Sequence, residues 1–378
     1  MAKVKIQGHA SGSGVLTITA PNTSTDRTVT LPDSTGTLLN SDGDGSSLTG
    51  VNAVNGGRKN LIINGGMQIA QRGTSTTSGA QAYLLDRFYT YQFNASGRTV
   101  SQSTDSPDEF SNSLKVIRAA NNTATTSVYL SQPIESKNCV GTAGKKITFS
   151  FWAKKGANWS ASGGTFPVTV TSGTGSDQSF MAGVTGGVTL INSSATLTTS
   201  WAKYSFTSSA IVPTNSTQLI YQTIAGWAGT AGADDSFYIT GIQLEIGETA
   251  TDFEHRSYGE ELALCHRYFQ AISFLAAWGS GIGKVRSSGQ AFTIVQFLTT
   301  MRAIPSTITS PTVGQASGNI TYLNGENYPS THGSINANEA SVDSCWFNLT
   351  GFSAIGSVGD ATWAYANGTA IFYFDAEL

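Results

Sequence analysis

Between residues 58 and 255, apolar side chains recur at every second position, in short runs separated by clusters of turn-forming residues. In "KITFSFWAKK", for example, Ile147, Phe149 and Phe151 fall on one side of the run and Trp152 on the other. Side chains of a strand alternate between its two faces, so this period predicts strands rather than helices. Many short strands divided by Gly, Asn, Ser and Asp turns predict an antiparallel β-sandwich of about 200 residues.

Charged residues make up only 12% of the 378 residues, and 42 residues are glycine. A surface wetted by hydroxyls and amides instead of charges suits an extracellular or particle-bound β protein. The net charge of −3 gives no sign of a basic surface that would bind nucleic acid. The sequence also has no run of about 18 apolar residues that could span a membrane. The N-terminus has no apolar segment of a secretory signal. A virion protein that is released by lysis would combine these properties.

The chain is expected to be all-β and to have four parts. They are a stalk segment at 1–57, the β-sandwich at 58–255, a linking helix at 256–270 and a β tip at 271–378. The first and last parts contain strand-like runs but few large apolar residues for a core of their own. We therefore expect these two parts to pack against identical chains, in a homotrimer.

One stretch, "SYGEELALCHRYFQ", has helical spacing. Ser257 and Glu260 fit a capping box at its start. One buried stripe is predicted from spacings of four, three and four, through Tyr258, Leu262, Cys265 and Phe269. Cys265 belongs to that stripe while His266 points about 100° away, so the pair is poorly placed to share a metal ion or a proton. We interpret the helix as a joint between two β parts, and the three cysteines as buried thiols.

Enzyme signatures are missing from the sequence: it has no nucleophile elbow, no phosphate-binding loop and no paired His motif. With four histidines, acid–base chemistry would depend on carboxylates, as in glycoside hydrolysis. Asp234, Asp235 and Glu245 are the only candidates, and adjacent acids in a Gly-rich stretch more often form a turn or hold calcium. We expect no enzyme activity.

Several stretches resemble parts of bacteriophage tail fibre proteins. "ITAPNTSTDRTVTLPDSTGTLL" (18–39) resembles their short shaft segments. "RKNLIINGGMQIAQRGTS" (58–75) and "DRFYTY" (86–91) resemble the start of a carbohydrate-binding-module-like jelly roll. "YITGIQLEIGETATDFEHRSYGEELALCHRYFQ" (238–270) is similar to the last strand of that module and the helix after it. "TTMRAIPSTITS" (299–310) and the ending "FDAEL" are similar to a C-terminal tip module.

The resemblance implies a trimeric receptor-binding fibre in the virion tail. Its N-terminus would attach to a tail or adaptor protein, and it would bind a host surface glycan such as lipopolysaccharide. It also implies a structural calcium ion at an edge of the jelly roll, with oxygen ligands from Asp234, Asp235 or Glu245. No other cofactor is expected.

Aromatic rings stack on sugars in glycan-binding modules, while amides and carboxylates bind the hydroxyls. Trp159 and Trp227 are flanked by turn residues in the jelly roll and could be exposed. The other candidates come from the tip stretch 318–346, which is rich in Asn: Tyr322, Tyr328, His332 and Trp346. Because a fibre hangs from the virion by one end, we expect the tip to carry the main receptor site.

Two alternative functions remain open from the sequence. A tailspike-like depolymerase would cut surface polysaccharide, and it would need a solenoid or a carboxylate pair across a groove. A purely structural decoration protein of the virion would bind no glycan.

Overall fold

The computed structural model describes residues 58–377, apart from 78–82, 93–96, 180–182, 275–280, 288–289, 310–318, 324–333, 351–360 and 368–369. The predicted shaft segment, residues 1–57, lies outside the described part. The chain divides into two compact units, Met1–Val51 and Asn52–Leu378. Every described residue belongs to the second unit.

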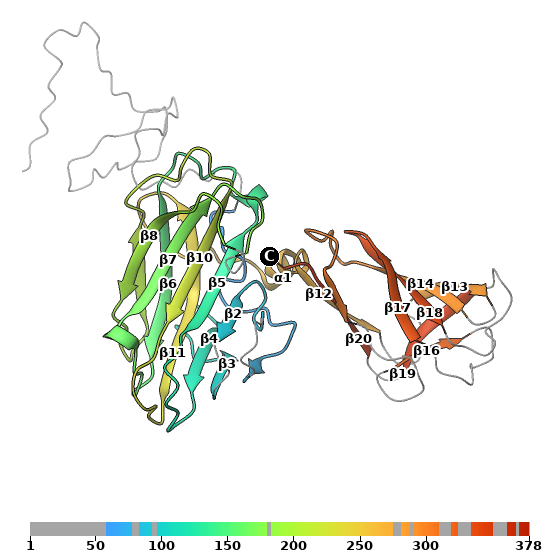
Figure 1. The fold of residues 1–378 in the computed structure, drawn as a ribbon, viewed down its shortest axis with the longest axis horizontal. Coiled ribbons are helices and arrows are strands. Elements are labelled where there is room, and N and C mark those ends of the chain that lie inside the picture. Colours follow the sequence, from blue (N-terminus) through green and yellow to red (C-terminus); the bar gives the residue numbers. More distant parts are fainter. Residues whose placement is uncertain are drawn as a thin grey trace, which may run out of the picture. The chain divides into compact units, whose positions relative to one another are not determined.

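Two antiparallel sheets built from eleven strands form a sandwich (Figure 1). The six-stranded sheet has the order β1 (Ser75–Thr76), β3 (Arg98–Ser103), β4 (Ser113–Arg118), β11 (Asp235–Ile246), β6 (Ile147–Lys155) and β9 (Ala202–Thr207). The five-stranded sheet has the order β2 (Tyr89–Gln92), β5 (Val128–Ile134), β10 (Gln218–Ala225), β7 (Phe166–Gly173) and β8 (Val188–Ala195). Short 3-10 turns lie at Ser136–Asn138 and Ser162–Gly164. The predicted all-β class and antiparallel sandwich are confirmed.

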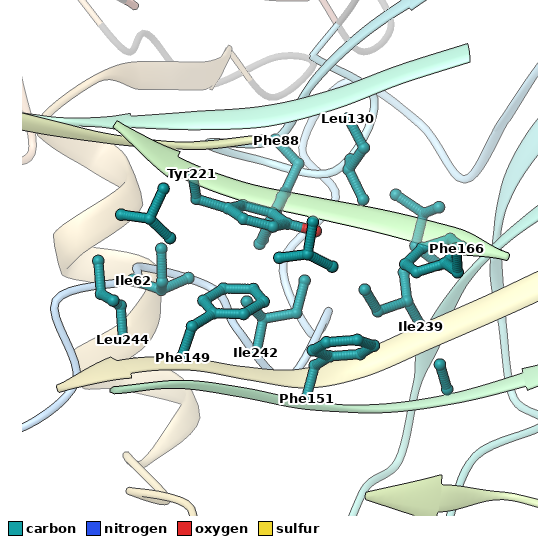
Figure 2. Close-up of a cluster of buried hydrophobic side chains, with 14 of the residues drawn as sticks. Ile62, Phe88, Leu130, Phe149, Phe151, Phe166, Tyr221, Ile239, Ile242 and Leu244 are labelled. Atoms are coloured by element: carbon teal, nitrogen blue, oxygen red, sulfur yellow. The ribbon is translucent and has the colours of Figure 1, made fainter. Parts of the chain in front are cut away.

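Aromatic side chains from both sheets fill the core of the sandwich (Figure 2). Phe149 and Phe151 of β6 are fully buried, as their period-two spacing predicts. The Phe149 ring stacks on Tyr221 of β10 with centroids 4.5 Å apart, and Phe151 lies 5.9 Å from Phe166 of β7. Burial of each such ring contributes about 2 kcal/mol, so these contacts hold the two sheets face to face.

The segment after Arg58 packs against β11 at the point where the register of β11 with β6 shifts, between Thr240 and Gln243. Asn60 donates from its side-chain nitrogen to the Ile242 carbonyl, and its side-chain oxygen accepts from the backbone nitrogens of Ile62 and Leu244. Gly65 lies so close to β11 that an added Cβ would meet the Ile242 oxygen at 2.1 Å. Only glycine permits this approach, which fixes the segment against the core.

The helix α1 spans Tyr258–His266, and its capping box is present as predicted. It is shorter than the predicted 256–270, because Phe269 already pairs with Asp375 in a β-sheet. The predicted stripe is partly wrong: Cys265 is fully buried, but Tyr258 is 60% exposed. Among the described residues, no helix is both long and apolar enough to cross a membrane.

Arginines and aromatic rings surround the end of α1. The Arg87 guanidinium lies 3.5 Å from the ring centroid of Tyr268, and Arg72 lies at the same distance from Phe269. Arg87 also pairs with the buried carboxylate of Glu377, and Arg72 pairs with Asp375 at 3.0 Å. These ion pairs and cation–π contacts connect the sandwich to the end of the chain at Asp375 and Glu377. The role of α1 as a joint stays an interpretation.

Residues after α1 form two further antiparallel sheets. One has the order β12 (Phe269–Phe274), β20 (Ala370–Asp375) and β15 (Thr307–Thr309). The other has the order β16 (Asn319–Leu323), β19 (Ala361–Asn367), β13 (Gly281–Ser287), β14 (Gln290–Gln296), β18 (Ser344–Thr350) and β17 (Ser334–Ala340). Phe372 and Phe374 are fully buried, and Phe372 lies 4.6 Å from Phe347 of the other sheet. The described residues of this part therefore bury several aromatic rings between the two sheets, and the homotrimer stays a prediction.

Candidate functional site

The side chains on the outer surface of the five-stranded sheet can be identified because successive side chains of a strand point to opposite faces. Tyr221 of β10 points into the core, so its neighbour Gln222 points outward. Gln222 is paired in register with Ser131 of β5, and Ser131 is paired with Tyr89 of β2. Two register positions away, Tyr91 and Tyr129 are direct partners on the same outer surface.

Four tyrosines gather at the β2 side of this surface, which we call the tyrosine face: Tyr83, Tyr89, Tyr91 and Tyr129. The rings of Tyr91 and Tyr129 are 6.1 Å apart at 52°, and Tyr83 meets Tyr89 edge-on at 5.3 Å. All four side chains are partly exposed. Flat rings of this kind offer C–H-binding surfaces without the entropy cost of long flexible side chains.

Two polar groups of this sheet are buried and lack a hydrogen-bond partner. They are the amide nitrogen of Gln222 and the hydroxyl of Tyr89. Gln222 is 6% exposed. Burial, followed by the nearby Tyr91, raises the pKa of Tyr89 to about 12, so its hydroxyl keeps its proton and can donate. An unpaired buried donor costs about 1–3 kcal/mol, and a ligand hydroxyl that accepts these bonds would remove that cost.

Charge is absent from the five strands of this sheet, which contain no Asp, Glu, Lys or Arg. Their outward positions instead carry Tyr, Gln, Ser, Thr, Asn, Ile and Pro. Such a surface matches an uncharged ligand with many hydroxyls, because a charged ligand would lose hydration without gaining an ion pair.

The two candidate tryptophans of the jelly roll, Trp159 and Trp227, are more buried than their turn-rich neighbours in the sequence suggest. Trp227 is 1% exposed and belongs to the sandwich core, so the expected exposure of its ring is wrong. Trp159 is partly buried and packs against Phe166 and Phe237 at 6.3 and 6.1 Å. The turn residues around both rings are local, whereas the rings are buried by strands distant in the sequence.

The three acidic residues predicted to bind calcium do not converge. Asp235 is fully buried and binds Arg118, and Asp234 accepts from Ser236 at 2.7 Å. Glu245 accepts from the backbone and hydroxyl of Thr251. Asp235 and Glu245 are ten positions apart along β11, which is roughly 30 Å in a strand. Within the described part of the chain, no cluster of three metal-ligating side chains occurs.

Among the four predicted tip residues, Trp346 has both its exposure and its ring contacts described. It lies on β18, is 43% exposed and meets Phe292 of β14 edge-on at 6.0 Å. Tyr322 lies on β16, opposite Ala364 of β19. Tyr328 and His332 lie outside the described residues. A ligand site in the tip therefore stays a prediction, with Trp346 as its accessible ring.

Cys265 and His266 on α1 show no sign of a reactive pair. Cys265 is fully buried, and burial raises its pKa well above the usual range, so it stays a neutral thiol. Burial lowers the pKa of His266. Glu261, by contrast, bonds to the backbone of Asn64 at 2.6 Å and pairs with Arg256 at 3.2 Å. These contacts fix α1 to the start of the sandwich.

The sequence interpretation missed the tyrosine face. Tyr89 and Tyr91 are two residues apart in "YTYQ" and so lie on one face of a strand. This spacing was the one feature of the sequence that could have indicated a pair of tyrosines on one strand face. The pairing of β2 with β5, which adds Tyr129, is set by contacts about 40 residues apart and is not encoded locally.

No protein-family model matches this sequence, and no curated protein matches it. Among solved structures, it is similar to the enzymatically active domain of tailspike protein 4 from bacteriophage CBA120, with 15% identity and a TM-score of 0.32 over 50% of this chain and 21% of that one. A family 4 carbohydrate-binding module matches with 16% identity and a TM-score of 0.30, over 49% of this chain and 99% of that one. A family 22 xylan-binding domain matches with 15% identity and a TM-score of 0.29, over 47% and 96% of the two chains. Similarities this low carry no functional argument.

Proposed function

We propose that this chain binds an uncharged glycan on its tyrosine face. The observation that carries the proposal is the unpaired amide nitrogen of Gln222, buried in an uncharged sheet beside four tyrosines. The rings would stack on sugar faces. To donate to sugar hydroxyls and so become satisfied, the Gln222 amide and the Tyr89 hydroxyl, which are buried in the unliganded chain, would have to turn outward.

The proposed role is binding rather than cleavage. Hydrolysis of a glycosidic bond normally uses two carboxylates on either side of it, and none is present on the five strands of this sheet. The glycosidic bonds of a glycan bound there would stay intact, so the glycan could serve as a receptor during attachment.

In its biological setting, we propose a phage tail fibre that adsorbs to the host through this glycan. The support is the resemblance of the 18–39, 58–75 and 238–270 stretches to tail fibre proteins. On this proposal the protein is a homotrimer in the virion tail, attached to a tail or adaptor protein by its N-terminal segment. Its partner is a neutral stretch of a host surface polysaccharide such as lipopolysaccharide.

An array of purified bacterial surface polysaccharides, probed with the full chain, tests the binding function. We expect neutral polysaccharides to be bound in preference to acidic ones. Tyr129→Ala should weaken binding about tenfold through the loss of a stacked ring, and Gln222→Met, which keeps the size of the side chain, about fivefold.

Tyr258→Ala is the matched control, because this tyrosine is exposed on α1, outside the tyrosine face. It should bind as the unchanged chain does, and all three variants should keep the melting temperature within a few degrees. Unchanged binding by folded Tyr129→Ala and Gln222→Met would reject the tyrosine face as the site. Failure of the unchanged chain to bind any polysaccharide would instead favour a structural decoration protein.

A further inference from the structure

A cleft of about 280 Å³ lies where the start of the sandwich meets the turn after β5. It is lined by five residues: Arg58, Asn60, Leu61, Lys137 and Asn138. Arg58 and Lys137 are exposed, while Leu61 and Asn138 are partly buried. The 3-10 turn Ser136–Asn138 positions two of these side chains, and its Asn138 backbone nitrogen donates to the Glu135 carbonyl at 2.8 Å. The cleft therefore presents two positive charges to the solvent.

Three carboxylates influence the charges of Arg58 and Lys137, and all three pair with other arginines. Glu254 and Glu261 both pair with Arg256, at 2.8 and 3.2 Å. Glu135 pairs with Arg267 at 2.5 Å. Within the described part of the chain, the two cations of the cleft have no ion-pair partner.

The cleft consequently carries an excess of positive charge. The pKa of Arg58 is lowered, first by partial burial and then by the charge of Arg256, although Glu254 and Glu261 act in the opposite direction. A guanidinium nevertheless stays protonated in proteins. An anion bound in the cleft would compensate this charge.

We propose that this cleft, the cationic cleft, binds one sugar ring that carries a carboxylate or a phosphate. Both groups match Arg58, because a guanidinium donates two parallel bonds to them, and Lys137 adds a second positive charge. The side-chain amide of Asn138 has no hydrogen-bond partner among the described residues, and an amide both donates to and accepts from hydroxyls. Leu61 provides an apolar contact for the C–H groups of the ring.

The size of the cationic cleft favours one ring over a bare anion or a polymer. A water molecule takes up about 30 Å³ of liquid, so the cleft corresponds to about nine waters. This is more than a free phosphate fills and too little for several rings. Nucleic acid is a poor match, because a polyanion gains its affinity from many phosphate contacts, about 6–10, and the cleft has two cations.

The cationic cleft is separate from the tyrosine face and takes a ligand of different charge. Lys137 and Asn138 follow the last residue of β5, whereas Tyr129 is next to its first residue. The tyrosine face takes a neutral stretch of glycan, and the cleft takes a single acidic sugar. A polysaccharide whose repeat combines neutral sugars with one acidic sugar would fit both sites.

Saturation-transfer NMR of the full chain with single sugars tests the proposal. We expect glucuronate and glucose 6-phosphate to bind, with affinities that fall as the salt concentration rises. Glucose 6-phosphate should bind about fivefold more tightly than inorganic phosphate, because its ring adds contacts with Asn138 and Leu61. Arg58→Gln should weaken the binding of both acidic sugars about tenfold, and Lys137→Gln about threefold.

Lys145→Gln is the matched control, because it removes one exposed positive charge outside the lining of the cleft. It should leave both affinities unchanged. Tyr129→Ala should do the same, so failure of this site and failure of the tyrosine face are distinguishable. Equal binding of glucuronate by Arg58→Gln and the unchanged chain, or no binding by either, would overturn the proposal. Inorganic phosphate that binds as tightly as glucose 6-phosphate would overturn it as well, since the site would then hold a free anion alone.

Discussion

Asp235 shows how a single buried carboxylate can determine the stability of one end of the sandwich. Its oxygens accept from Arg118 and Ser160, and both members of the ion pair are completely buried. At this carboxylate the cation is the guanidinium of Arg118. A calcium ion at an edge of the jelly roll stays a prediction.

We predict that Asp235→Asn lowers the free energy of unfolding by about 3 kcal/mol, because it leaves the Arg118 charge buried and unpaired. Chemical denaturation would measure the loss. Asp105→Asn is the matched control: Asp105 pairs with Lys154 but is 45% exposed, so its loss should cost roughly 0–1 kcal/mol. Similar costs for the two variants would contradict this account of the buried pair.

Asp86 predicts a pH dependence of stability. Burial is the main cause that raises its pKa to about 6, against the lowering effects of Arg72 and Gln71. Because the folded pKa exceeds the unfolded value, this residue favours folding most at low pH, and the contribution is lost as the pH rises through about 6. The expected loss is on the order of 3 kcal/mol between pH 4 and pH 7.

Melting temperatures of the unchanged chain and Asp86→Asn across that pH range would check the prediction. The melting temperature of the variant should not show the decrease with rising pH that Asp86 causes. Plotted against pH, it should therefore fall less steeply than that of the unchanged chain, or rise. Only the difference in slope matters, because the substitution also changes the bonds with Gln71 at every pH. Parallel profiles would show that Asp86 does not titrate in this range.

At the scale of elements, α1 depends on its N-cap residue, Ser257. Ser257 accepts from the backbone nitrogen of Glu260 at 3.3 Å, while the Glu260 carboxylate accepts from the backbone nitrogen of Ser257 at 2.9 Å. We predict that Ser257→Ala destabilises α1 by about 1 kcal/mol and Ser257→Gly by only a few tenths. Hydrogen exchange of the α1 amides measures both, and equal protection in the two variants would contradict the capping role.

The last strand depends on ion pairs at the joint. Glu377 pairs with Arg87 and, at 3.5 Å, with Arg72, and both Glu377 and Arg87 are almost completely buried. We predict that Glu377→Gln accelerates hydrogen exchange in β12 and β20, at a cost of about 3 kcal/mol. Glu248→Gln, at a residue that is 72% exposed, should change nothing there. Unchanged exchange in Glu377→Gln would mean that these ion pairs do not hold the strand.

For the whole molecule, local pattern was enough to predict the fold class. The period-two runs correctly placed Phe149 and Phe151 inside, and the capping box correctly placed the start of α1. The positions of the candidate binding residues could not be predicted in this way, because they depend on the pairing of strands that are distant in the sequence. Trp227 is buried by strands far away in the sequence, and Tyr129 joins Tyr91 only through the pairing of β2 with β5. Turn residues beside a ring therefore say little about its exposure.

The tyrosine face also changes which part of the chain is expected to carry the receptor site. The sequence interpretation favoured the tip, where Trp346 is exposed and meets the ring of the partly buried Phe292. The sandwich offers four rings, an uncharged sheet and two unpaired donors. On this account the sandwich is the main site, and the tip pair is at most a second one.

The most direct test is a crystal structure of the full chain with an oligosaccharide from a polysaccharide that it binds. The account predicts sugar rings stacked on Tyr91 or Tyr129, with a hydroxyl oxygen within hydrogen-bonding distance, about 3 Å, of the Gln222 amide nitrogen. Sugar bound against Trp346 and Phe292, with the Gln222 amide still unpaired, would contradict it.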